Sequence, residues 1–121
     1  MPTTDPTTRS CAELRRRNSV RAAARARDAA LRRREITRMR ELERDSRAKA
    51  LDLSQAILDA QPELYSLECR AIGAERSGDE DAWTVYNDAC HEMRNLIRTR
   101  DEAIDTAAAA REVLTSLHRL P

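Results

Sequence analysis

The sequence has little of what sheets and tight turns require. Its 121 residues include no phenylalanine, one tryptophan, two tyrosines, two glycines and four prolines. Strands favour aromatic and β-branched residues, and turns favour glycine and proline. Alanine, glutamate, arginine and leucine dominate instead, and all four favour helices. We therefore expect an all-α protein with a thin core of leucine, isoleucine and alanine.

Long apolar runs and paired cysteines are also lacking. No stretch approaches the roughly 18 apolar residues of a membrane span, and the first ten residues lack the basic-then-apolar order of a signal peptide. Cys11, Cys69 and Cys90 are odd in number and widely spaced, which argues against a secreted disulfide framework. These features predict a cytoplasmic protein with reduced thiols and no membrane partner.

Charge is abundant and unevenly distributed. Residues 1–50 carry 15 basic and 7 acidic side chains, whereas residues 51–121 carry 7 basic and 14 acidic ones. The net charge of +1 thus hides a basic first part and an acidic second part. Lys49 is the only lysine, a bias that suggests a GC-rich bacterial genome or its mobile elements.

The order of helix-breaking residues predicts three segments. Residues 1–9 contain Pro2, Pro6 and four threonines, and we expect a disordered tail there. From Ser10, a candidate N-cap, no glycine or proline occurs until Pro62, where we expect a kink or a break. A turn is expected at residues 77–80 around Gly78. The last helix should then run to about Leu117.

Apolar residues on both sides of this turn recur at helical spacing and predict packing between the two segments. Before the turn they are Met39, Leu42, Ala50, Leu53, Ile57, Leu64, Tyr65, Leu67 and Ile72. After it they are Trp83, Tyr86, Ala89, Cys90, Met93, Leu96, Ile97, Ile104, Ala107, Leu114 and Leu117. Reversal at Gly78 places residues opposite each other when their numbers add to about 156, because both helices rise equally per residue. Leu42 should then meet Leu114, Ala50 should meet Ala107, Leu53 should meet Ile104, and Ile72 should lie near Trp83 and Tyr86.

This register predicts a long antiparallel helical hairpin, similar to a coiled coil, over residues 39–121. The last helix ends opposite about Met39, so residues 10–38 are expected to form a basic helical arm without an intramolecular partner. A full break at Pro62 would give a three-helix bundle instead.

The basic stretch from Arg15 to Arg40 is the strongest candidate for binding. Its eleven arginines are Arg15, Arg16, Arg17, Arg21, Arg25, Arg27, Arg32, Arg33, Arg34, Arg38 and Arg40. Arginine pairs with phosphates and releases counterions, which makes nucleic acid one candidate ligand. However, these arginines occupy all sides of the helix, and no aromatic residue lies between them for base stacking. A protein partner is therefore the preferred interpretation.

No pattern predicts a catalytic, cofactor or metal site. Cys69, Cys90 and His91 lack the close ligand spacing of structural zinc sites, and the two cysteines are expected to be buried as small apolar residues. Asp88 and His91 form a single Asp-x-x-His without the second copy of a di-iron bundle.

The sequence thus predicts a non-enzymatic helical interaction module without a cofactor or small-molecule substrate. A thin two-helix core favours self-association, so we expect a homo-oligomer acting as an assembly, adaptor or inhibitor protein of a bacterial or phage system. The alternative is a nucleic-acid-binding protein that uses the arginine-rich helix 15–40.

Overall fold

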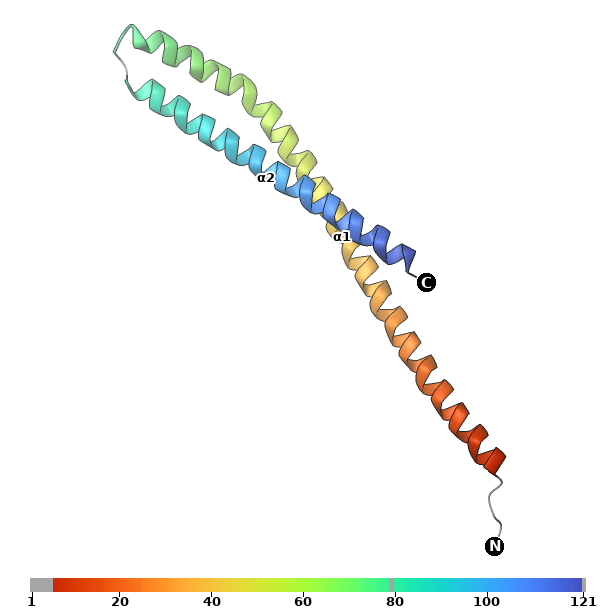
Figure 1. The fold of residues 1–121 in the computed structure, drawn as a ribbon. Helices are drawn as coiled ribbons and strands as arrows, with labels where there is room; N and C mark the ends of the chain where they lie inside the picture. Colours follow the sequence, from red (N-terminus) through yellow and green to blue (C-terminus); the bar gives the residue numbers. More distant parts are fainter. Residues whose placement is uncertain (1–5, 79, 121) are drawn as a thin grey trace. The chain divides into compact units, whose positions relative to one another are not determined.

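The computed structural model describes residues 6–78 and 80–120, and within them it contains two helices and no strand. Helix α1 spans Pro6–Glu75 and helix α2 spans Glu80–Arg119. The chain divides into two compact units, Met1–Arg38 and Met39–Pro121. In the second unit, α1 and α2 lie side by side and antiparallel (Figure 1). The expected all-α fold and the helical hairpin are confirmed.

Helix α1 begins earlier than the sequence suggested. We expected a disordered tail over residues 1–9 and a cap at Ser10, but α1 starts at Pro6. Proline is well suited to the first turn of a helix, because its fixed φ is helical and its missing N–H would have no intrahelical acceptor there. Helix α1 thus includes residues 6–9 of the expected tail, and residues 1–5 lie outside the described part of the chain.

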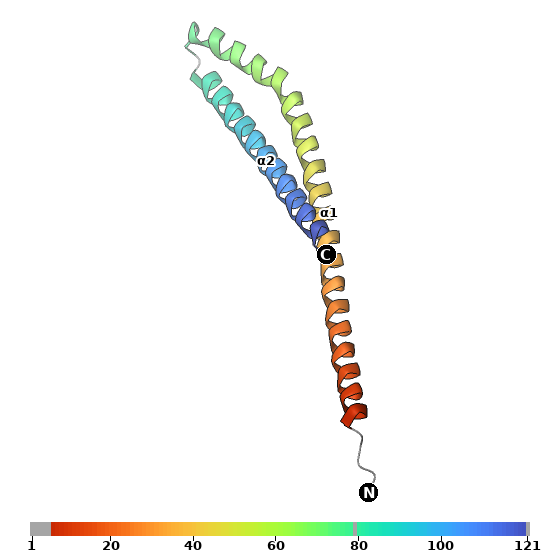
Figure 2. The same ribbon diagram turned by 45° about the vertical axis from the view of Figure 1, so that its right-hand side comes forward.

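Pro62 does not end α1, so the three-helix bundle is wrong. The residue lies within the helix and is exposed, on the side away from α2. Proline lacks the N–H that would bond the carbonyl of Leu58, and its ring pushes that carbonyl away. On an exposed face water can satisfy this carbonyl, which lets the helix continue. Figure 2 shows α1 bent in its yellow-green part, with the concave side toward α2.

The hairpin is held by one row of side chains on each helix, which we call the seam of that helix. Residues in each seam follow one another at alternating spacings of three and four. All of these positions are buried or half-buried. In α1 they are Met39, Glu43, Ser46, Ala50, Leu53, Ile57, Ala60, Leu64, Leu67, Ala71 and Ala74. In α2 they are Tyr86, Ala89, Met93, Leu96, Arg100, Ala103, Ala107, Ala110, Leu114 and Leu117. Such spacing is typical of coiled coils, and the many alanines let the two backbones approach closely.

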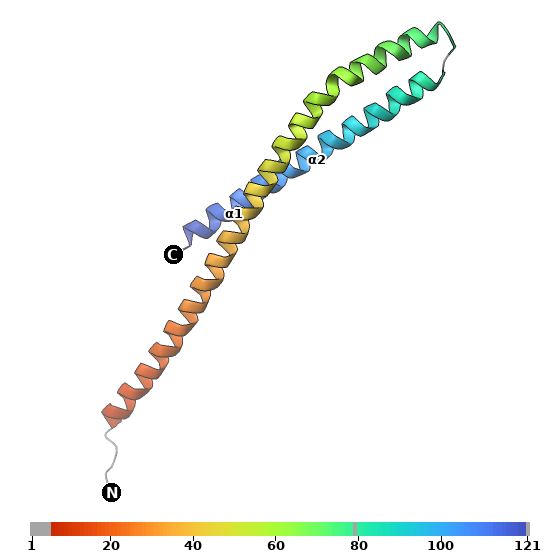
Figure 3. The same cartoon turned by 180° about the vertical axis from the view of Figure 1, so that it is seen from behind.

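The register between the helices agrees with the value expected from the sequence. Leu67 and Ala89 line the same crevice, as do Ala60 and Leu96, and the residue numbers of each pair add to 156. Ala50 and Ala107 are both buried and line a common groove farther from the turn. The views from the front, from the side and from behind agree that the yellow part of α1 and the blue part of α2 lie adjacent (Figures 1, 2 and 3).

The reversal itself is built by the residues that follow α1. The backbone N–H of Ser77 donates to the carbonyl of Ala74 at 3.0 Å, and its hydroxyl donates to the same oxygen at 3.1 Å. Gly78 then adopts φ of +76°, a left-handed conformation that a residue with a Cβ rarely takes. Glu80 and Asp81 lie in the first turn of α2, where carboxylates stabilise the positive end of the helix dipole.

Four residues expected in the core are exposed instead. Leu42, Tyr65, Ile72 and Ile104 are 40%, 69%, 53% and 49% exposed. Each is next to a seam residue in the chain, and one residue corresponds to a rotation of about 100° around the helix. Ala71 and Ala103 fill the seam beside Ile72 and Ile104, so the smaller neighbour faces the partner helix. The expectation that these four residues lie in the core is therefore wrong.

Among the helices of residues 6–78 and 80–120, none is long and apolar enough to cross a membrane.

Candidate interaction surfaces

The basic stretch is almost entirely accessible. Ten of its eleven arginines are exposed and Arg32 is half-buried. Every residue from 10 to 28 is exposed. The exposed arginines are accessible to a ligand, but they are not gathered on one face of the helix.

One of these arginines has an acidic partner within the same helix. The Nη2 atom of Arg38 lies 2.7 Å from Oε1 of Glu35, and its Nε donates to the other carboxylate oxygen at 3.1 Å. This bidentate hydrogen bonding, together with the charge of Glu35, raises the pKa of Arg38. Because both side chains are solvent-exposed, the pair stabilises the helix only slightly.

The cysteine and histidine residues do not form a site. Cys69 is exposed, Cys90 is half-buried and His91 is exposed. The expectation that Cys69 is a buried apolar residue is wrong, because its position lies outside the seam of α1. No cluster of three or more potential metal ligands occurs within residues 6–78 and 80–120.

A second row of apolar residues on α1 does not face α2. Leu51, Leu58, Tyr65 and Ile72 are spaced by seven residues, and we call them the apolar stripe. Their exposed fractions are 72%, 57%, 69% and 53%. A spacing of seven keeps side chains on one face of a helix and is the repeat of a coiled-coil seam. We expected Tyr65 and Ile72 in the core, and Leu51 and Leu58 were missed altogether. Their heptad spacing was the signal that could have revealed them.

Residues between and beyond those of the apolar stripe complete a regular row on this face of α1. The row carries opposite charges at its two ends. At alternating spacings of four and three, the row reads Arg40, Arg44, Arg47, Leu51, Ser54, Leu58, Gln61, Tyr65, Glu68, Ile72 and Glu75. The three arginines precede the apolar stripe, and the two glutamates lie near the turn. The face thus combines a central apolar strip with a basic end and an acidic end.

Helix α2 adds to the same side of the hairpin. A groove between the helices is lined by Ala50, Leu51 and Ser54 of α1 and by Ile104, Ala107 and Ala108 of α2, together with charged residues. Leu51 and Ile104 are both exposed. The apolar stripe therefore continues across the groove onto α2 near Leu51.

Two tyrosines interact with cysteines one turn farther along their helices. Hydrogen bonding to Cys69 and the charge of its thiolate raise the pKa of Tyr65, with smaller effects from burial and from Glu68. Hydrogen bonding to Cys90 and burial raise the pKa of Tyr86, and the charge of Glu68 contributes to this increase. The influence of Glu68 in α1 on Tyr86 in α2 fits the observed pairing of the helices near the turn.

Trp83 and Tyr86 form an edge-to-face pair close to the turn. Their ring centroids are 5.8 Å apart with an interplanar angle of 75°, and both side chains are half-buried. Such pairs contribute about 0.5–1.5 kcal/mol beyond the burial of their area. They are placed to stabilise the first turns of α2 in the hairpin.

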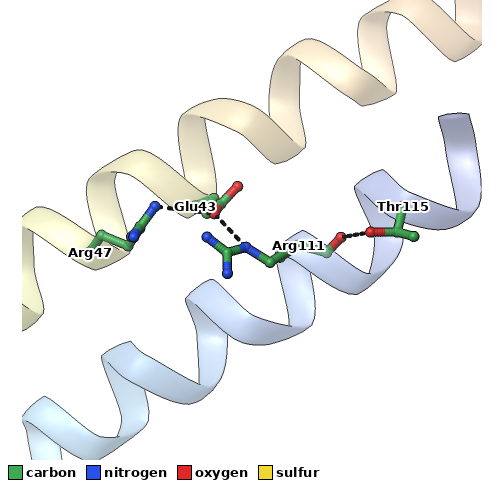
Figure 4. Close-up of polar contacts among 4 residues, drawn as sticks. All are labelled: Glu43, Arg47, Arg111 and Thr115. Carbon is green, nitrogen blue, oxygen red and sulfur yellow. Dashed lines mark hydrogen bonds and ion pairs between the residues drawn. The ribbon is translucent and has the colours of Figure 1, made fainter.

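The other end of the hairpin contains a polar cluster. Arg111 Nε donates to Glu43 Oε1 at 3.2 Å, and Arg47 Nη1 lies 3.6 Å from the same oxygen (Figure 4). The Glu43 side chain is only 17% exposed, because it occupies a seam position of α1. A charged residue at a seam position can fix the register of a coiled coil, since other registers would leave its charge unpaired.

No protein-family model matches this chain, and neither a curated protein nor a solved structure is significantly similar to it.

Proposed function

We propose that this chain is a non-enzymatic helical interaction module that binds a helical protein surface through the apolar stripe. The exposure of Leu51, Leu58, Tyr65 and Ile72 at a spacing of seven residues supports this proposal most directly. Surface apolar residues are usually scattered, whereas these four recur at one fixed spacing on a single helix face, with Ser54, Gln61 and Glu68 between them. A heptad row is suited to receive another helix.

The preferred biological role is that of an assembly, adaptor or inhibitor protein of a bacterial or phage system. The use of arginine in place of lysine motivates the proposed origin. A two-helix hairpin with an accessible apolar face and charged ends can position a second helical protein without performing chemistry. Binding in such a role depends on the face of α1 rather than on a pocket.

Affinity capture with matched variants tests the proposal. The tagged wild-type chain is compared with the double variant Leu58→Glu, Tyr65→Glu and with the control Val113→Glu, each incubated with extract of the encoding organism. Val113 is an exposed apolar residue of α2 outside the apolar stripe. We expect proteins retained by the wild type and by the control to be lost with the double variant. Equal retention by all three chains would contradict a role for the stripe.

Nucleic-acid binding by the basic stretch is the second candidate function. It is favoured by the exposure of all residues from 10 to 28, which leaves their arginines free to approach phosphates. Fluorescence anisotropy with labelled duplex DNA and RNA across a salt series tests this function. A phosphate-binding helix loses affinity steeply as salt increases, by about 0.9 logarithmic units per phosphate contact for each tenfold increase in salt. The variant with Arg15, Arg16 and Arg17 changed to glutamine should reduce that slope.

A further inference from the structure

We propose that a second copy of this chain binds the apolar stripe. The α1 helices of the two copies would pack antiparallel to each other, with Gln61 of both copies near a twofold axis. This inference rests on the proposed function and specifies its partner. It follows from the order of side chains along the exposed face of α1, a face that α2 does not cover.

The exposed row is self-complementary when it is read in opposite directions. Gln61 lies within half a residue of the midpoint between Leu58 and Tyr65, and equally close to the midpoint between Leu51 and Ile72. An antiparallel partner centred there places Leu58 against the partner's Tyr65, and Leu51 against the partner's Ile72. Apolar side chains thus meet apolar side chains on both sides of the axis. A twofold interface requires such self-complementarity, because each copy presents the same patch.

The charged ends of the row meet with opposite sign in this arrangement. Arg47 and Glu75 are equally distant from Gln61, at fourteen residues on either side. Each Arg47 would therefore lie beside the partner's Glu75. Both residues are exposed. Arg47 Nη1 lies 3.6 Å from Glu43 Oε1 of its own copy, so Arg47 would reach the partner's Glu75 through its other guanidinium nitrogens. A parallel arrangement would instead place Arg47 beside Arg47 and Glu75 beside Glu75, and like charges disfavour such contacts.

The size of this face determines the expected affinity. The row from Arg47 to Glu75 is about 42 Å long at 1.5 Å per residue. A strip about 10 Å wide along it would bury roughly 400 Å² per copy, about half of a standard interface. Ile104 of α2 lies on the same side as Leu51 and can extend the contact. We therefore expect a dimer with a dissociation constant in roughly the micromolar range.

Molecular mass as a function of concentration is the primary test. Sedimentation equilibrium of the full chain over roughly 1 to 500 µM should show a reversible increase from 13.8 kDa to twice that mass. Leu58→Glu should weaken dimerisation by at least about tenfold, since the change occurs twice in each interface. Val113→Glu is the matched control and should leave it unchanged. Circular dichroism of each variant verifies that the helices are intact.

A charge-reversal cycle tests the proposed pairing. Arg47→Glu and Glu75→Arg should each weaken dimerisation by about threefold or more, and the double variant should recover most of that loss. The two residues are about 42 Å apart along one helix, so they cannot restore each other within a single copy. If the double variant loses as much dimerisation free energy as the two single variants together, the proposed register is wrong.

Cysteine cross-linking tests the orientation. In a chain with Cys11, Cys69 and Cys90 replaced by alanine, Gln61→Cys should form an intermolecular disulfide under mild oxidation. Ser54→Cys should not, because residue 54 would lie opposite the partner's Glu68. Cross-linking at both positions would indicate a parallel pair and overturn the antiparallel arrangement.

These measurements separate the failure of this inference from failure of the proposed function. A chain that stays at 13.8 kDa over the whole concentration range overturns self-association through the stripe. If the double variant Leu58→Glu, Tyr65→Glu still loses captured proteins in that case, the proposed function is supported without a second copy. If the wild type dimerises but Leu58→Glu does so equally well, the stripe is not the interface and the inference is wrong.

Discussion

The Nε atom of Arg111 in α2 donates a hydrogen bond to Oε1 of Glu43 in α1, and the two atoms are 3.2 Å apart. The pair joins the helices at the end of the hairpin remote from Gly78. Glu43 occupies a seam position at which most of its side chain is covered. A contact so far from the turn fixes how one helix is aligned with the other along the whole hairpin.

Reversing the charge of Arg111 should therefore destabilise the hairpin. Arg111→Glu would place two carboxylates together at a partly covered position, and we expect a loss of about 1–2 kcal/mol. The double variant Glu43→Arg, Arg111→Glu should recover part of it. Arg98 is exposed and outside the seam, so Arg98→Glu is the control and should change stability by no more than about 0.5 kcal/mol. Urea denaturation measures all four chains, and an unchanged Arg111→Glu would show that the contact does not stabilise the fold.

Adjacent residues of α2 test the placement of the core. Leu114 is buried in the seam, whereas Val113 is partly exposed. Leu114→Ala should cost about 2–4 kcal/mol, because it removes buried methyl groups and leaves a cavity. Val113→Ala should cost well under 1 kcal/mol. Thermal melting of both variants provides the comparison, and equal melting temperatures would mean that the seam has been assigned to the wrong face.

The sequence predicted the turn, the two apolar segments and their register, because these depend on glycine, proline and apolar periodicity over many residues. It did not predict, at several positions, which of two adjacent residues in the chain packs against the other helix. Hydrophobicity favours Ile72 over Ala71, whereas close helix packing favours the smaller side chain. The apolar stripe was missed because Tyr65 and Ile72 were assigned to the core and Leu51 and Leu58 were not assigned to any face. One helix can carry two apolar rows, and their phases differ by a single residue.

Replacing Pro62 should stabilise α1. Pro62 is exposed, so replacing it with alanine removes no buried apolar contact. Pro62→Ala restores an N–H that can bond the carbonyl of Leu58, and proline is about 3 kcal/mol less favourable than alanine inside a helix. We expect a higher melting temperature. A lower one would show that the bend in α1 is required for packing against α2.

The titration of Tyr65 should depend on Cys69. Hydrogen bonding to the thiol and the negative charge of its ionised form raise the pKa of Tyr65 above the ordinary value of about 10. A raised pKa in the folded chain means that this interaction stabilises the fold below the unfolded pKa and is lost as pH rises through the folded one. In a Tyr86→Phe background, Cys69→Ala should shift the phenolate absorbance transition to lower pH. An unchanged midpoint would show that Cys69 does not influence the phenol.

The unit formed by residues 39–121 should fold without the unit that precedes it. The unit formed by residues 39–121 contains both heptad seams and the contact between Glu43 and Arg111. Every residue from 10 to 28 is exposed and contributes no buried side chain to a core. Deleting residues 1–34 should therefore leave a cooperative melting transition near that of the full chain, since burial rather than helix length provides the stability. Under the proposed arrangement, dimerisation through the apolar stripe should also persist, and any affinity for nucleic acid should be lost. Loss of the cooperative transition would mean that the basic segment is part of the core, and the division of the chain into a folded hairpin and a separable basic arm would be wrong.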